Sequence, residues 1–92
     1  MSPNSETTQQ VELAVTLPAN LHARPAGALT RAAAAFRSDI RIGYGDRTAN
    51  PASVLAVMTL GATKGATVTI TADGPDAEAA VQALADVLAT AE

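Results

Sequence analysis

Pro25 fixes the point at which the first third of this 92-residue chain changes from strand to helix. A proline ring holds φ near the helical value and has no N–H, so it suits the first turn of a helix and disrupts a helix interior or a central strand. Before it, residues 11–17 alternate apolar and polar side chains, which predicts a half-buried strand. After it, an alanine-rich run reaches Phe36 and predicts a helix over about 24–37. The segment between them is therefore a turn that ends at a helix N-terminus.

The rest of the chain again shows the alternation typical of strands and the sequence signals typical of helices. Residues 39–44 alternate again, and a Gly-Asp turn leads into a short return strand over 47–50. Residues 51–60 contain a short helix that Pro51 and Ser53 introduce, and residues 66–72 form another alternating strand. Residues 73–76 then supply the cap and first turn of a last helix. Because the expected sheet has one polar face and the helices carry apolar stripes, the pattern indicates an α+β fold in two layers.

Size and composition limit what the chain can do. Residues 11–92 are enough for a single domain, whereas residues 1–10 are polar without an apolar period and predict a flexible tail. The absence of cysteine and the single histidine exclude a disulfide framework and a multi-histidine metal centre. A net charge of -3 with only 2% aromatic residues argues against nucleic acid as a partner. No apolar run reaches membrane length and no signal-peptide layout is present, so we expect a cytoplasmic protein without membrane insertion.

His22, the only histidine, lies in the turn just before the predicted helix start. A helix N-terminus presents unpaired backbone N–H groups and a partial positive charge, both of which favour a phosphate. Arg24, two residues later, adds a planar guanidinium that matches phosphate oxygens. The pair therefore points to phosphoryl chemistry. The alternative is a solvated loop histidine beside an ordinary surface arginine, because short motifs also occur by chance.

Two separated motifs resemble a known family. The first is Leu21-His22-Ala23-Arg24-Pro25-Ala26, and the second runs from Asn50-Pro51-Ala52-Ser53 through Gly61 to Lys64-Gly65-Ala66. Together they resemble HPr, the histidine-containing phosphocarrier of the bacterial phosphoenolpyruvate-dependent sugar phosphotransferase system, over about residues 11–92. Asn20 departs from the resemblance, because the family usually has glycine there; asparagine tolerates the positive φ that a tight turn can need.

The resemblance implies a fold and an activity. The fold is an open-faced β-sandwich, in which a four-stranded antiparallel sheet of order 1-4-2-3 carries three helices on one face. The activity is that of a carrier rather than a turnover enzyme, with no cofactor or metal. His22 is expected to accept a phosphoryl group on Nδ1 from phosphorylated enzyme I and to pass it to IIA domains of sugar permeases, while Arg24 stabilises the phosphate. We expect a monomer.

The resemblance also implies a partner-binding surface and a regulatory residue. Val54, Leu55 and Met58 share a helix face and match the apolar docking patch of the family; the same spacing also fits a core stripe, unless Val57 and Leu60 are the inward pair. Arg31 matches a basic docking position, or is simply solvated. Ser53 matches the serine that HPr kinase/phosphorylase modifies, or acts only as a helix cap.

Other functions remain open from the sequence. The helix start and Arg24 could bind an anionic metabolite in a regulatory domain whose His22 is never phosphorylated. A paralogue serving a nitrogen-related phosphotransferase chain or a dihydroxyacetone kinase relay would carry the same motif. A free-standing hydrolase is the weakest alternative, because no second acid, base or nucleophile lies near His22 in the sequence.

Overall fold

The computed structural model describes residues 9–91, which form four strands and three helices. The strands are β1 (Gln9–Thr16), β2 (Asp39–Tyr44), β3 (Arg47–Ala49) and β4 (Thr67–Gly74), and the helices are α1 (Ala23–Ala33), α2 (Val54–Met58) and α3 (Ala77–Ala89). Along the chain they follow the order β1, α1, β2, β3, α2, β4, α3. This sequence of element types is the one that the alternating and helical periods predict.

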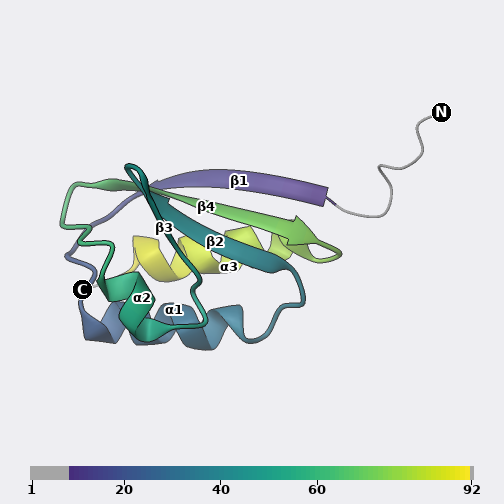
Figure 1. Ribbon diagram of the computed structural model, residues 1–92, viewed down its shortest axis with the longest axis horizontal. Coiled ribbons are helices and arrows are strands. Elements are labelled where there is room, and N and C mark those ends of the chain that lie inside the picture. The colour runs from purple at the N-terminus through teal and green to yellow at the C-terminus, as the bar shows by residue number, and fades with distance from the viewer. Residues whose placement is uncertain (1–8, 92) are drawn as a thin grey trace.

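The four strands form one antiparallel sheet in the order β1-β4-β2-β3. The predicted order 1-4-2-3 and the open-faced sandwich are therefore confirmed. Figure 1 shows the sheet as one layer with all three helices on one side of it, and α1 and α3 running in opposite directions. The other face of the sheet has no helix over it, which explains why polar threonines alternate with apolar residues along β4.

The core between the two layers is aliphatic. Leu29 of α1, Ile42 of β2, Ile70 of β4 and Leu84 of α3 are all fully buried and belong to one cluster. Small side chains such as Ala26 and Ala80, each 0% exposed, let the helices approach the sheet closely. No helix among residues 9–91 is long and apolar enough to cross a membrane.

The edge strand β1 starts earlier than the sequence pattern predicts. Gln9 pairs with Gly74 and Gln10 with Asp73, so β4 also extends beyond the predicted end at residue 72. Backbone ladder bonds do not require apolar side chains, and the polar glutamines therefore continue the strand. Residues 9 and 10 thus belong to the sheet and not to the predicted tail. The rest of that tail, residues 1–8, lies outside the described residues.

Helix α1 ends at Ala33, four residues before the predicted end, although alanine continues to residue 35. Two hydrogen bonds of the 3₁₀ type follow, each spanning three residues: the Ala35 N–H donates to the Ala32 carbonyl and the Phe36 N–H to the Ala33 carbonyl, both at 3.2 Å. The chain then meets the carboxylate of Asp76, which accepts the backbone N–H of Arg37 at 3.0 Å. Arg37 therefore lies beyond the helix, and its predicted place in the last helical turn is wrong.

Asp76 has a different role from the one expected of it. It occupies the N-cap position of α3, but its side chain makes no bond to that helix. Instead its Oδ1 accepts both the backbone N–H of Ser38 at 3.0 Å and the Ser38 hydroxyl at 2.5 Å. These bonds, led by the one from the hydroxyl, lower the pKa of Asp76 below its usual value. Asp76 therefore ties the turn after α1 to the start of α3.

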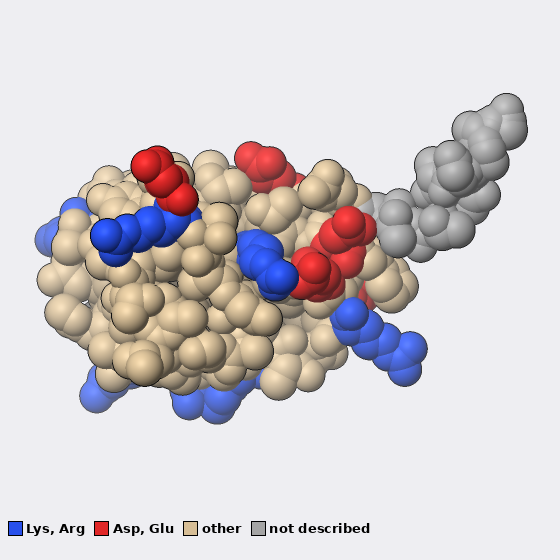
Figure 2. Space-filling model, viewed as in Figure 1, with Lys and Arg blue, Asp and Glu red and all other residues tan. Residues whose placement is uncertain are grey.

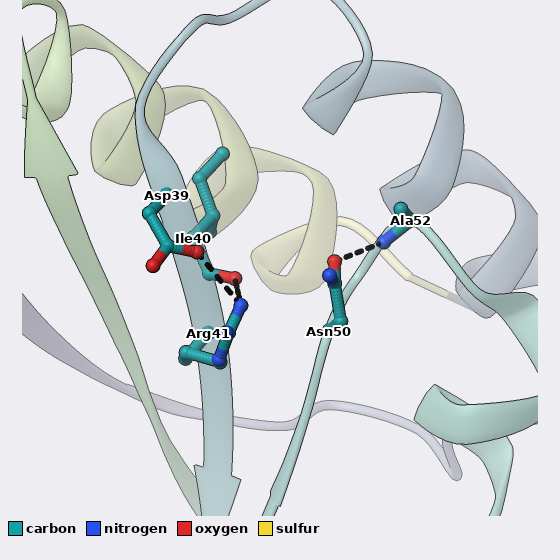
Figure 3. Close-up of polar contacts among 5 residues, drawn as sticks. All are labelled: Asp39, Ile40, Arg41, Asn50 and Ala52. Carbon is teal, nitrogen blue, oxygen red and sulfur yellow. Dashed lines mark hydrogen bonds and ion pairs between the residues drawn. The ribbon is translucent and has the colours of Figure 1, made fainter.

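A local side-chain hydrogen bond stabilises the turn before α2 (Figure 3). Oδ1 of Asn50 accepts a hydrogen bond from the backbone N–H of Ala52 at 2.9 Å, which stabilises the turn that leads the chain toward α2.

On the neighbouring strand β2, the guanidinium of Arg41 donates to the carboxylate of Asp39 at 2.8 Å and to the carbonyl of Ile40 at 3.1 Å. Arg41 and Asp39 are both largely exposed, so their ion pair contributes little stability.

Candidate functional site

His22 occupies the N-cap position of α1, with an extended backbone (φ -83°, ψ -171°). Its carbonyl accepts the first helical bond, from the Ala26 N–H at 3.0 Å, while its side chain is exposed and makes no capping bond. Buried neighbours hold the turn on both sides: Leu21 is 5% exposed and Pro25 is also buried. The chain therefore fixes the backbone of His22 and leaves its imidazole in solvent.

The start of α1 gives this position a positive character. Pro25 has no N–H and Ala26 donates to His22, so the N–H groups of Ala23 and Arg24 are the first-turn donors without a helical acceptor. No acidic residue lies in the first turn of α1 to occupy them. An anion next to the imidazole would meet these donors and the positive end of the helix.

The loop between α2 and β4 lies against the histidine turn. Leu21 N–H donates to the Ala62 carbonyl at 3.1 Å, and Gly65 N–H donates to the Leu17 carbonyl at 2.8 Å. As a result, Lys64 and His22 line the same shallow depression of about 350 Å³, together with Pro18, Ala19 and Asn20. Lys64 is a cation at the site that the sequence reasoning did not assign; it was visible only as part of the second motif.

The side chain of Asn20 contacts both Lys64 and His22 across this depression. Its Oδ1 accepts the backbone N–H of Lys64 at 2.7 Å, and its Nδ2 lies 3.4 Å from Nε2 of His22. The tolerance of asparagine for positive φ is not used at position 20, because among the described residues only glycines have positive φ. The side chain, not the backbone, is what distinguishes asparagine here.

Arg24 lies apart from the depression that contains His22. It is exposed and lines a second depression, of about 300 Å³, with Ala28 of α1 and with Val87, Thr90 and Ala91 at the end of α3. No hydrogen bond or ion pair joins Arg24 to His22 within residues 9–91. The two residues are therefore neighbours along the chain whose side chains line different hollows.

Helix α2 carries the other predicted positions. The Ser53 hydroxyl accepts the Ala56 N–H at 3.1 Å, which makes Ser53 a true N-cap. Leu55 is 71% and Met58 37% exposed, Val54 is half-buried against the core, and Val57 and Leu60 are buried. The expected inward pair is therefore confirmed, and Leu55 and Met58 form an exposed apolar patch. Arg31, in the last turn of α1, is also exposed.

Charged side chains do not gather into one patch on the face of the molecule that Figure 2 shows. Figure 2 shows acidic and basic side chains interspersed among uncharged residues on the face in view, without a continuous basic stripe. Within the part of the chain that the structure describes, no group of three or more His, Cys, Asp or Glu side chains could hold a metal ion. The cations next to His22 in space or sequence are Lys64 and Arg24.

Known proteins resemble this chain in sequence and fold. The family described as "PTS HPr component phosphorylation site" matches residues 9–90. A phosphocarrier protein HPr from Bacillus anthracis is 37% identical, with a TM-score of 0.76, over 88% of this chain and 96% of that one. HPr-C-His from Thermoanaerobacter tengcongensis is 32% identical, with a TM-score of 0.75, over 87% and 90%. Crh, the catabolite repression HPr of Bacillus subtilis, is 30% identical, with a TM-score of 0.73, over 91% and 100%.

Proposed function

The chain belongs to the HPr family of phosphocarriers of the phosphotransferase system, and from this premise we propose that His22 carries the phosphoryl group. The family acts as a carrier and not as a turnover enzyme. The observation that supports His22 most directly is its exposed imidazole at the N-cap of α1, beside unpaired helix N–H groups and Lys64. An exposed imidazole can reach the active sites of two partners in turn, and the helix N-terminus stabilises the anionic phosphate that it carries from one to the other.

The proposed reaction is a pair of reversible transfers. The lone pair of Nδ1 attacks phosphorus while the bond from phosphorus to its donor atom on enzyme I breaks, and the electron pair of that bond stays with the donor. The attack requires the neutral ring with its proton on Nε2, because a protonated Nδ1 has no lone pair to donate. In the second transfer an acceptor atom of a IIA domain attacks, and the Nδ1–phosphorus pair returns to His22. Phosphoryl transfer of this kind needs positioning and charge stabilisation more than covalent machinery.

We assign the charge stabilisation to the first-turn N–H groups, Arg24 and Lys64. Arg24 is exposed and two residues from His22, so its guanidinium has the freedom to turn from its hollow toward an arriving phosphate. Lys64 is already on the rim of the histidine depression and contributes a point charge. A loosely held phosphate suits a carrier, which has to release its cargo.

We further propose that partners dock on the exposed apolar patch of Leu55 and Met58, with Val54 at its base and Arg31 as a basic contact. Helix α2 packs against α1, so the patch and His22 belong to the same helical layer. A phosphate on Ser53, added by HPr kinase/phosphorylase, would place negative charge beside this patch. The protein is proposed to act as a cytoplasmic monomer, because enzyme I and IIA domains need only brief access to a small surface.

Intact-mass measurement after incubation with enzyme I and phosphoenolpyruvate tests the proposal. We expect the wild-type protein to gain one phosphoryl group that brief acid treatment removes, as a phosphoramidate does. His22→Ala should stay folded and gain none, because residue 22 is exposed. Uptake by His22→Ala would disprove the assignment. No uptake by wild type, with a competent control carrier, would favour the anion-binding regulatory domain.

A further inference from the structure

The sulfur chemistry of this chain is confined to two methionines. The sequence contains no cysteine, and its methionines are Met1 and Met58. Of these, Met58 lies in the part of the chain that the structure describes, as the last residue of α2. Thiols and thioethers are the side chains that mild two-electron oxidants such as hydrogen peroxide attack first. Oxidation of the described fold by peroxide therefore concerns Met58 before any other residue.

Met58 is accessible and contributes little to the core. It is 37% exposed, and it lies three residues after Leu55 on the same helix, so the two side chains are neighbours on one face. Val57 supplies the fully buried side of α2, whereas Met58 belongs neither to the core cluster of residues 9–91 nor to the half-buried side chains packed against it. An oxidant can therefore reach Met58, and a change there leaves the core packing intact.

The reaction of a thioether with peroxide is a balanced oxygen transfer. A lone pair on Sδ of Met58 attacks one peroxide oxygen and the O–O bond breaks. The departing hydroxide takes the proton of the transferred oxygen and leaves as water, so that sulfur loses two electrons and peroxide gains them. Methionine sulfoxide reductases reverse the change with two electrons and two protons from a pair of thiols, which become a disulfide, and the oxygen leaves as water.

The sulfoxide is poorly suited to an apolar contact. A thioether is flexible and apolar, so it adapts to irregular apolar surfaces of a partner. The sulfoxide carries a polar oxygen, which loses its hydration when a partner covers it and weakens binding unless the partner supplies a donor. Leu55, the neighbour that shares the patch, has no donor to offer this oxygen.

We propose that Met58 is a reversible oxidation site that controls docking: its sulfoxide weakens the contact between the apolar patch of α2 and enzyme I, and reduction restores that contact. This inference rests on the proposed docking of partners on Leu55 and Met58, and it adds regulation by peroxide to that surface. His22 lies outside α2, at the N-cap of α1. Oxidation of Met58 therefore changes how well the partner binds and not the transfer of the phosphoryl group itself.

The matched variant is Met58→Leu, because leucine keeps the apolar volume of methionine and takes up no oxygen. Wild type and Met58→Leu are treated with hydrogen peroxide, freed of it by gel filtration, and assayed for kcat and KM with phosphorylated enzyme I. Peptide mass locates the added oxygen, and circular dichroism checks that the fold persists. Met58→Leu retains Met1, so it also controls for oxidation at that residue.

We expect peroxide to add one oxygen to the wild-type peptide that contains Met58 and to raise KM about tenfold with kcat nearly unchanged, because a polar group enters an apolar contact. A methionine sulfoxide reductase with a thiol reductant should restore the original KM. Met58→Leu should keep its KM throughout.

An unchanged KM in wild type whose Met58 is fully oxidised would overturn the proposal, as would an equal rise of KM in Met58→Leu. Resistance of Met58 to peroxide that oxidises free methionine would overturn it as well. Failure of untreated wild type to accept a phosphoryl group is a different result: it would refute the proposed function, and this inference with it.

Discussion

The hydroxyl of Thr30 donates to the carbonyl of Pro51 at 2.7 Å and so joins the middle of α1 to the turn that leads into α2. The same hydroxyl lies 3.1 Å from the Ala26 carbonyl one turn back along α1. Pro51 is among the fully buried side chains, so its neighbourhood offers little water to replace the bond. This hydrogen bond therefore adds a direct link between the helix that carries His22 and the turn that leads into the helix with the apolar patch.

Thr30→Val should therefore lower the free energy of unfolding by about 1 kcal/mol, because it keeps the shape of threonine and removes the donor. Urea denaturation followed by circular dichroism measures the change. Thr67→Val is the control, since the Thr67 hydroxyl bonds that of Thr16 at 3.3 Å in an exposed position on the sheet. A cost at Thr67 as large as that at Thr30 would contradict the interpretation.

Gly74→Ala should be the more damaging of two glycine substitutions. Gly74 has φ +154°, and a Cβ there would lie 2.8 Å from the Cα of Ser38, a backbone atom that cannot move aside cheaply. Gly45 also has positive φ, +62°, but open space around it. We expect about 1 kcal/mol for Gly45→Ala from backbone strain alone, and at least about 2 kcal/mol for Gly74→Ala. Equal losses in urea unfolding would rule out the predicted clash.

Asp76→Asn should destabilise the protein at neutral pH, because an amide cannot replace a carboxylate as acceptor for the Ser38 hydroxyl and the two backbone N–H groups. The lowered pKa of Asp76 sets the pH dependence: its contribution is present above the unfolded value of 3.8 and is lost as pH falls below it. Thermal unfolding of both proteins from neutral to acidic pH should show the difference shrinking below about pH 4. A difference independent of pH would exclude the carboxylate as its source.

Arg24→Ala should slow phosphoryl acceptance by about tenfold and Lys64→Ala by about threefold, since a bidentate guanidinium stabilises phosphate better than a point charge. Rapid-quench measurement of kcat/KM with phosphorylated enzyme I provides the test. Arg41→Ala serves as control, because Arg41 pairs with Asp39 on the sheet. Acceptance unchanged in both variants would mean that the helix N–H groups suffice.

Leu55→Ala should weaken partner docking without weakening the fold. The side chain is 71% exposed, so its removal should change stability by less than about 0.5 kcal/mol. We expect the KM of enzyme I for this carrier to rise about threefold with kcat nearly unchanged, because the variant loses one apolar contact with its partner. Val57→Ala, on the buried side of α2, should show the opposite pattern: lower stability and normal KM. A normal KM in both Leu55→Ala and Met58→Ala would remove the patch from the interface.

The sequence alone was sufficient for the order and type of the elements. Alternation at residues 39–44 and 66–72, the proline at position 25 and the serine cap at position 53 are each signals carried by a few neighbouring residues, and they agree with one another on the type of each element. The motif around His22 likewise pointed to the helix start where the structure has it. The choice of Val57 and Leu60 as the inward pair followed from helical spacing.

Only the tertiary structure decided which distant loops meet. The chain that follows the end of α1 at Ala33 is held by Asp76, whose carboxylate bonds a turn 38 residues earlier in the chain. The neighbourhood of His22 depends on the contact between Asn20 and Lys64, 44 residues apart, and the hollow that Arg24 lines is completed by the end of α3. No local period or propensity specifies such pairs, because their geometry exists only after the sheet has brought the loops together.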